Sequence, residues 1–311
     1  MKVKTLIAIP VYNSALFIEK TIESAFNQSV PVDVLVCDNC STDQTLELLN
    51  ELKAKKYNEL IIIKNPINYG RKENWNICLD FFAKSNYELI KFLFAGDVIY
   101  SNCIETVEYF YDLHPDIGAL AFPYFFVENN NKYLSAHKKH FNRVLTPKEV
   151  TEINLTKGGI LGAIISNVYT KYGVKDHKFD TTFGSKLSFD IRVLETTNLF
   201  YINTPLADFN LNNRGTFNRA NSAKYYLEFS SIEFSELERI IASDSFPEFN
   251  YKKIEQKIII NTTVRMLQFI KIESLLPLLF RSFKPLLLAF LNPIKKTKVG
   301  TFLRKIKYAI N

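Results

Sequence analysis

The sequence predicts an α/β fold in which a mostly parallel central sheet is covered by helices on both faces. In the first half of the 311-residue chain, short apolar and β-branched segments alternate with amphipathic segments of helical spacing. The order strand, helix, strand requires right-handed crossovers between parallel strands. The expected strands are residues 5–9, 33–36, 60–64, 88–94 and 118–122.

Helices are expected between these strands. The first follows Asn13 or Ser14, either of which suits an N-cap, and the second opens with the capping-box pattern of residues 41–44. A third is expected over residues 71–83, and a fourth over 101–113, where Pro115 stops it. Beyond Phe94 the alternation weakens through residue 219, and helical patterns return after Ser222.

Composition narrows the class of protein. The hydrophobic fraction of 47% and the charged fraction of 23% are those of a folded globular chain. No run of 18 apolar residues occurs, so we expect no integral membrane protein, and the apolar N-terminal run is too short for a signal peptide. The four cysteines form no disulfide framework, and the C-x-x-C of Cys37 and Cys40 lacks a second metal-binding pair. A reducing, cytoplasmic location is therefore expected.

Charge is concentrated at the C-terminus. Residues 271–311 contain nine Lys or Arg and one acid, a net +8, so the other 270 residues carry −1 of the total +7. Apolar residues interleave with these cations, and prolines divide the segment into short helices. Such a segment suits an anionic membrane surface, which predicts peripheral attachment. A helical cap on the catalytic domain and a dimer interface remain alternatives, and the oligomeric state is left open.

Polar residues follow the first two strands directly. The first loop reads Ile9-Pro-Val-Tyr-Asn13 and the second Val36-Cys-Asp-Asn-Cys-Ser-Thr-Asp43. Ligands of parallel α/β sheets bind outside the carboxyl ends of the strands, where an acid can accept hydrogen bonds from ribose or a base. Asp38 and Asp43 are candidates for that role, and each could instead only cap a turn or helix.

Together, these two loops resemble those of the inverting glycosyltransferases of family two, which have the Rossmann-like GT-A fold. The resemblance continues through Asn68-Tyr-Gly70, Asn74-Trp-Asn76 and residues 90–97, and it covers roughly residues 5–215. It implies a catalytic domain over residues 1–220, followed by a helical, basic, amphipathic C-terminal region over 221–311. The implied donor-nucleotide residues are Pro10, Tyr12, Asn13, Asp38, Asn68, Gly70, Asn76, Asp97 and Arg214.

The resemblance also implies a divalent metal, Mg²⁺ or Mn²⁺. The family usually has two acids at the end of the fourth strand, whereas this chain reads Phe94-Ala-Gly-Asp97 and keeps only the last. Asp97 is therefore the expected metal residue, with phosphates and waters completing the shell. A metal-independent enzyme stays an alternative.

The family's general base usually follows an F-D-x-x-F segment. Residues 179–183 match this segment, and Asp190 is the next acid. Ungapped counting places Ser188 at the usual position, but a hydroxyl is no general base at neutral pH, so Asp190 is the expected catalytic base. The alternative is an acid near a helix start that serves the helix dipole.

Two further loops are assigned by the same resemblance, and Trp75 is interpreted separately. The glycine-containing loop 158–162 approaches the donor phosphates, where missing Cβ atoms admit backbone N–H groups. Arg214 lies in the loop expected near the diphosphate, and could equally be a solvated arginine. Trp75 is expected to pack its helix on the sheet rather than stack on a sugar.

The expected function is transfer of a hexosyl or N-acetylhexosaminyl unit from a nucleotide-sugar, most commonly a UDP-sugar in this family, to a glycan or lipid-linked oligosaccharide. Bacterial surface polysaccharide synthesis (O-antigen, lipooligosaccharide or capsule) on the cytoplasmic face of the inner membrane is the implied setting. The alternative is a non-catalytic sugar-nucleotide or glycan-binding relative. A dehydrogenase or a nucleotidyltransferase would need a glycine-rich turn after the first strand, which is absent. No nucleic-acid partner is expected.

Overall fold

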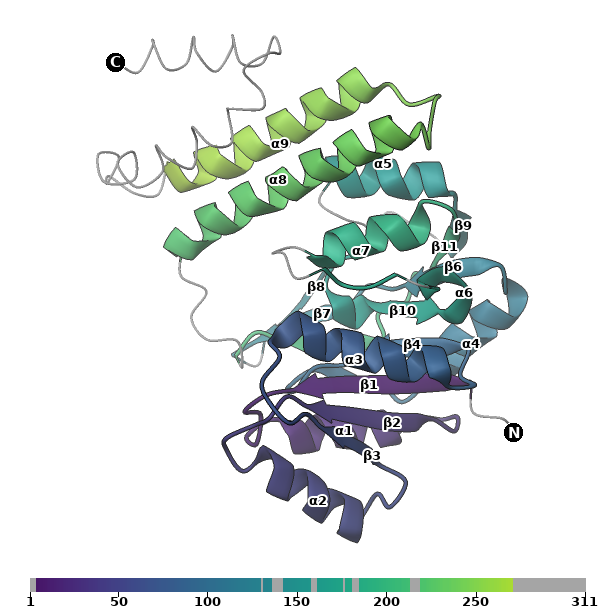
Figure 1. The fold of residues 1–311 in the computed structure, drawn as a ribbon, viewed down its shortest axis with the longest axis vertical. Helices are drawn as coiled ribbons and strands as arrows, with labels where there is room; N and C mark the ends of the chain where they lie inside the picture. Colours follow the sequence, from purple (N-terminus) through teal and green to yellow (C-terminus); the bar gives the residue numbers. More distant parts are fainter. Residues whose placement is uncertain are drawn as a thin grey trace.

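The computed structural model describes residues 4–129, 131–135, 142–157, 161–175, 177–180, 185–212 and 219–270. The loop positions 158–160, Arg214 and the basic segment 271–311 lie outside the described residues. In the first half, strands and helices alternate as predicted (Figure 1). The elements there are β1 (Thr5–Val11), α1 (Ile18–Phe26), β2 (Asp33–Asp38), α2 (Thr45–Lys55), β3 (Ile61–Lys64), α3 (Arg71–Lys84), β4 (Leu89–Phe92), β5 (Val98–Ile99) and α4 (Cys103–Leu113).

The second half contains more regular structure than the sequence pattern indicates. Its elements are β6 (Ile117–Ala121), β7 (Phe125–Glu128), β8 (Asn131–Leu134), β9 (Arg143–Leu145), α5 (Pro147–Lys157), the short 3₁₀ helix η1 (Ile164–Ser166), β10 (Asn167–Thr170), α6 (Lys171–Val174), α7 (Ser185–Leu194), β11 (Asn198–Tyr201), β12 (Ala207–Asn210), α8 (Arg219–Ser243) and α9 (Tyr251–Ile270).

The described strands form two sheets. The large sheet has the order β3-β2-β1-β4-β10-β6-β11-β9, and the small sheet has the order β5-β12-β7-β8. Strands β3, β2, β1 and β4 are parallel, whereas β10 pairs antiparallel with both β4 and β6. The predicted α/β class is confirmed, and the inserted β10 makes the second half of the sheet mixed.

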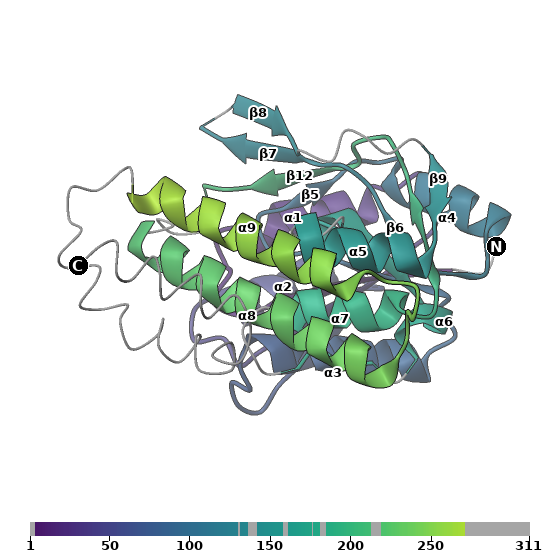
Figure 2. The ribbon, with the colours of Figure 1, turned by 90° about the horizontal axis from the view of Figure 1, so that it is seen from above.

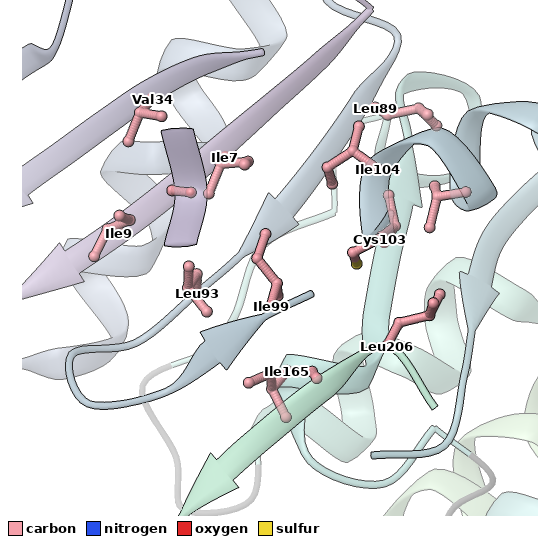
Figure 3. Close-up of a cluster of buried hydrophobic side chains, with 14 of the residues drawn as sticks. Ile7, Ile9, Val34, Leu89, Leu93, Ile99, Cys103, Ile104, Ile165 and Leu206 are labelled. Atoms are coloured by element: carbon pink, nitrogen blue, oxygen red, sulfur yellow. The ribbon is translucent and has the colours of Figure 1, made fainter. Parts of the chain in front are cut away.

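Successive residues of the buried strands point to opposite faces of the large sheet, so the hydrophobic core has one part on each face. Ile7, Ile9 and Val34 pack in one cluster with α1, α2 and α4, whereas Leu6 and Ala8 pack in another with α3, α5 and α7. Figure 3 shows the first cluster, in which Leu93 and Ile99 connect the large sheet to the small one. This period of two is what a strand buried on both faces requires.

The long helices α8 and α9 lie side by side and cover α5 and α7 (Figures 1 and 2). Their apolar residues form a third cluster with Leu155 of α5 and Ile191 of α7. Ion pairs reinforce the contact: Arg192 of α7 pairs with Glu236 of α8, and Arg239 of α8 pairs with Glu195. A helical region thus follows the α/β part and packs on its helices.

The predicted helix caps are wrong. Helix α1 begins only at Ile18, and α2 at Thr45, and neither N-cap residue makes a side-chain capping bond. Asn13 has a positive φ of 49°, and its side-chain oxygen Oδ1 accepts from the backbone N–H of Thr42 at 2.8 Å. These polar residues join the loops to one another instead of capping the helices.

Candidate functional site

The carboxyl ends of β1 to β4 meet at one edge of the large sheet, as their parallel register requires. Val11 of β1 lies beside Asp38 of β2, and Asp38 beside Lys64 of β3. The N-terminal end of α3 lies at the same edge, because Asn74 donates to the carbonyls of Val11 and Cys37. This edge collects the predicted donor-site residues Pro10, Tyr12, Asn13, Asp38, Asn68 and Gly70.

Asp38 organises the loop that follows it. The side chain is fully buried, and its carboxylate accepts from the backbone N–H of Ser41 at 3.2 Å and from the Ser41 hydroxyl. Ser41 in turn accepts from the backbone N–H of Asn13 at 2.9 Å. Tyr12, between the buried Val11 and this contact, leaves 46% of its surface exposed. The exposed ring and the fixed loops form a surface on which a planar base can lie.

A cluster of asparagine amides fixes the neighbouring loop, and sequence reasoning identified only part of it. Asn39 donates to Asn68 at 2.8 Å and to the Gly70 carbonyl at 3.2 Å, and it accepts from the Tyr69 backbone. Asn65 donates to Asn39 at 3.1 Å and to Asn74 at 2.9 Å. Buried amides that are satisfied in this way specify one loop conformation. The amides come from the loops after β2 and β3 and from α3, so only the parallel register of the two strands reveals the cluster.

Asn76 has a different environment from the other predicted donor residues. Its amide donates to the carbonyl of Phe179 at 2.8 Å and accepts from the Phe179 N–H at 2.9 Å. Trp75 beside it stacks on Phe94, with ring centroids 5.1 Å apart, and meets Phe179 edge-on. Trp75 therefore packs between helix and sheet, and Asn76 holds the segment that leads toward α7.

Asp97 lies where the two sheets meet. It is 1% exposed, and its carboxylate accepts from the backbone N–H of Asn210 in β12 at 3.0 Å. Gly96 has a φ of 93°, which favours glycine, and its N–H donates to Thr21 at 2.9 Å. The turn therefore has one fixed geometry.

Whether the protein can hold a divalent metal ion at this turn depends on a single acid, Asp97. The described part of the chain has no group of three or more His, Cys, Asp or Glu side chains that could hold a metal ion. One carboxylate with phosphate and water oxygens is nevertheless a donor set that Mg²⁺ accepts. Asp97 fits a metal that is bound together with a diphosphate rather than by protein ligands alone.

Two cations at the start of α3 were not predicted. The guanidinium of Arg71 lies 5.7 Å from the ring centroid of Trp75. Nζ of Lys72 is shielded from solvent and has no hydrogen-bond partner within the described ranges. Burial lowers the pKa of Lys72, and the charge of Asp180 opposes this effect. A shielded ammonium without a partner beside the strand ends is suited to an anionic ligand.

Asp190 lies in α7 and is 3% exposed. Its carboxylate accepts from the Tyr169 hydroxyl at 2.7 Å and pairs with Lys186. Burial raises the pKa of Asp190, while Lys186 and Tyr169 act in the opposite direction. Ser188, the alternative by ungapped counting, is also buried. Asp190 is thus a buried acid on which burial and two fixed partners act in opposite directions.

Lys91 is a buried cation in β4 that the sequence analysis did not single out. Its Nζ donates to the carbonyls of Phe92 and Asn167 at 3.1 and 3.3 Å and to that of Ile165, and it lies 5.2 Å from the ring centroid of Phe122. Burial lowers its pKa to about 8, opposed by the charge of Asp97. The ammonium therefore joins β4 to the η1 turn behind Asp97.

The large sheet thus has a polar edge, with one acid at the turn after β4 and a second buried acid on α7. The chain matches the profile of Glycosyl transferase family 2 over residues 6–171, more than half of its length. It belongs to this family, and the predicted glycosyltransferase class is confirmed at that level.

Several named relatives support the same class. The chain is 25% identical over 178 residues to the minor teichoic acid biosynthesis protein GgaB of Bacillus subtilis, covering 56% of this chain and 19% of that protein. It is 39% identical over 70 residues to a poly(ribitol-phosphate) beta-glucosyltransferase of Bacillus spizizenii, covering 22% and 11%. It is 35% identical over 92 residues to the Escherichia coli UDP-Glc:alpha-D-GlcNAc-diphosphoundecaprenol beta-1,3-glucosyltransferase WfaP, covering 29% and 34%. The chain thus spans only part of each of these relatives.

Solved structures share the fold. Staphylococcus aureus TarS 1–349 in complex with UDP-GlcNAc superposes with a TM-score of 0.61 at 17% identity, covering 87% of this chain and 76% of that one. The mannosyltransferase PcManGT of Pyrobaculum calidifontis, in complex with GDP-Man and Mn²⁺, gives 0.54 at 14% identity, covering 93% and 81%. At such identities the similarity establishes the GT-A fold alone.

Proposed function

We propose that this protein is an inverting glycosyltransferase that transfers a sugar from a nucleotide-diphosphate sugar to a hydroxyl of a glycan or lipid-linked glycan in bacterial cell-surface polysaccharide synthesis. The observation that carries the proposal is the convergence of Asp38, Asp97 and the asparagine cluster at one edge of a family-two sheet. The names of the relatives support a UDP-sugar donor and a surface-polymer acceptor.

We propose the following donor roles, which the positions of these residues at the sheet edge support. The exposed Tyr12 ring, with Pro10, Asn13 and Asp38, binds the nucleoside, and Asn68 and Gly70 shape the adjoining loop. Asn76 acts through the Phe179 segment rather than by touching the donor. Arg71 and Lys72, at the start of α3, are proposed to contact the diphosphate. Arg214, which lies outside the described residues, is proposed for the same role from the sequence resemblance.

Asp97 would hold a divalent cation, Mg²⁺ or Mn²⁺, together with the donor phosphates. When bound, such a cation stabilises the charge that develops on the leaving diphosphate. The protein itself contributes a carboxylate whose orientation Asn210 fixes through its backbone N–H.

Asp190 is the proposed general base. It takes the proton of the acceptor hydroxyl while the oxygen of that hydroxyl forms a bond to the anomeric carbon. The bond from that carbon to the phosphate oxygen breaks, and its electron pair leaves with the nucleoside diphosphate. Attack from the opposite face inverts the anomeric configuration, and a positioned base contributes roughly 10²- to 10⁴-fold to the rate.

We further propose that residues 1–220 form the catalytic domain and that residues 221–311 form a helical region whose basic end attaches to the cytoplasmic face of the inner membrane. The charge of +8 over residues 271–311 supports this. None of the described helices is long and apolar enough to span a bilayer. Sedimentation with anionic and neutral vesicles tests attachment: salt-sensitive binding to the anionic vesicles alone is expected, and equal recovery with both contradicts it.

The decisive experiment is nucleoside diphosphate release from UDP-glucose, UDP-GlcNAc and GDP-mannose with Mn²⁺, Mg²⁺ or EDTA. Donor-selective, metal-dependent release that Asp97→Ala and Asp190→Asn both abolish is expected. Calorimetric donor binding without turnover, even with lipid-linked glycans from bacterial membranes, would instead establish the alternative, a non-catalytic sugar-nucleotide-binding relative.

A further inference from the structure

The Asp190 carboxylate is held from two separate elements. Tyr169 reaches it from β10, in the middle of the large sheet, and donates to Oδ1 at 2.7 Å. Lys186, one helical turn earlier on α7, pairs with Oδ2. Tyr169 and Asp190 are both almost completely buried, whereas the Lys186 side chain retains 20% of its exposure. The partners therefore fix both carboxylate oxygens inside the protein.

The partners are themselves fixed. An ammonium requires an acceptor, so the Asn167 amide is oriented with its oxygen toward Lys186 Nζ, 2.8 Å away, and its nitrogen toward the Leu161 carbonyl, 2.7 Å away. The backbone carbonyl of Asn167 accepts from Lys91 at 3.3 Å. Phe189 packs edge-on against the Tyr169 ring, with centroids 5.1 Å apart. A continuous polar path thus runs from Lys91 in β4 to Asp190.

We propose that Tyr169 is a positioning residue for the general base: from its rigid strand, its hydroxyl holds the Asp190 carboxylate in one orientation, and Lys186 supplies the counter-charge that keeps it ionised. This inference rests on the proposed role of Asp190. A hydrogen bond to an ionised acceptor is short and strong, and it favours the charged form of that acceptor. Burial alone would favour the protonated, inactive form.

The other charged groups around α7 have partners elsewhere. Glu236 and Arg239 of α8 pair with Arg192 and Glu195. Lys171 of α6 donates to the Ser85 carbonyl, and Glu152 of α5 pairs with Lys257. Glu233 of α8 is buried. The groups that act directly on the ionisation of Asp190 are Lys186 and Tyr169.

Tyr169→Phe tests the inference, with Tyr87→Phe as the matched control. The Tyr87 hydroxyl donates to Asp33 at 2.6 Å, a similar tyrosine–carboxylate bond at the opposite end of β2 from Asp38. For each full-length variant we would measure nucleoside diphosphate release against pH, the donor dissociation constant, and the carboxyl titration of Asp190 by ¹³C NMR of protein labelled at aspartate Cγ. Asp190→Asn identifies the resonance.

Tyr169→Phe is expected to reduce kcat by roughly ten- to a hundredfold, the value of one hydrogen bond to a charged group, with donor affinity unchanged. Because the base acts in its ionised form, the acidic limb of the rate profile and the NMR midpoint should both move to higher pH. Lys186→Met should move them in the same direction, Lys186→Arg should restore them, and Tyr87→Phe should change none of these quantities.

An unchanged NMR midpoint in Tyr169→Phe would overturn the inference, as would a loss of kcat with no shift of the acidic limb. Wild-type kcat in Asp190→Asn would overturn it together with the assignment of the base. If the wild type turns over no donor, the proposed function fails, but the NMR titration still tests the contact. A shift of the Asp190 titration midpoint in Tyr169→Phe would then support the hydrogen bond between Tyr169 and the carboxylate.

Discussion

The side-chain amide of Asn76 forms two hydrogen bonds with the backbone of Phe179, one in each direction, at 2.8 and 2.9 Å. These bonds bridge 103 positions of sequence and attach α3 to the segment before α7. The sequence resemblance assigns Asn76 to donor binding, whereas its environment favours a structural role, and the two roles predict different outcomes.

Asn76→Leu should destabilise the fold by roughly 2–4 kcal/mol, because it leaves a buried N–H and a buried carbonyl without partners. Urea unfolding measures this change. Asn58→Leu, on an exposed residue, is the control and should stay within about 0.5 kcal/mol of the wild type. A tenfold loss of donor affinity at unchanged stability would show that Asn76 contacts the donor directly.

Asp97→Asn separates charge from geometry. The amide oxygen can still accept from the Asn210 N–H, so this contact with β12 should be kept. The hard anionic ligand is lost, so Mn²⁺ binding in the presence of donor should weaken by at least about tenfold, together with metal-dependent turnover. Calorimetry measures both, with the exposed Asp116→Asn as control. Wild-type metal affinity in Asp97→Asn would contradict the assignment.

Lys72→Met should weaken donor binding by roughly tenfold, the value of one charge-assisted hydrogen bond. Nζ is shielded and has no hydrogen-bond partner among the described residues, while the charge of Asp180 favours the ammonium form, so its removal should change the melting temperature little. The exposed Lys20→Met is the control for charge alone. Equal donor affinity in both variants would place the diphosphate elsewhere.

The lowered pKa of Lys91 should make the free energy of unfolding depend on pH. Its pKa is about 8 in the folded protein and 10.5 unfolded, so protonation disfavours the fold. The contribution of Lys91 to stability is complete above pH 10.5 and is lost as the pH falls through 8. Relative to Lys91→Met, the wild type should therefore gain up to about 3 kcal/mol between pH 8 and 10.5. Denaturant unfolding across this range measures the difference, and a flat difference would refute the lowered pKa.

The sequence predicted the parts of this protein that depend on local pattern. The spacing of apolar residues predicted the parallel strands β1 to β4 and the helices α3 and α4. As expected, Asp38 lies at the end of β2 and Asp97 lies in the turn after β4. The predicted helix caps were wrong because Asn13 and Ser41 form hydrogen bonds between loops instead. Strand β10 has only four residues and pairs with β4, whose partner residues lie 77 to 81 positions earlier, so no local period marks it. The hydrogen bond between Tyr169 and Asp190 depends on that strand pairing, so the sequence pattern could not predict it either.

The place of β10 in the large sheet also has a consequence for how the chain is made. Strand β4 has an unpaired edge until residues 167–170 leave the ribosome, because β10 rather than β6 covers it. An open edge containing Leu89, Ile90 and Phe92 is a template for pairing with other chains. During synthesis, the nascent protein therefore passes through a stage in which strands β1 to β4 are formed but the edge of β4 is open to aggregation. Synthesis and pairing of β10 end that stage.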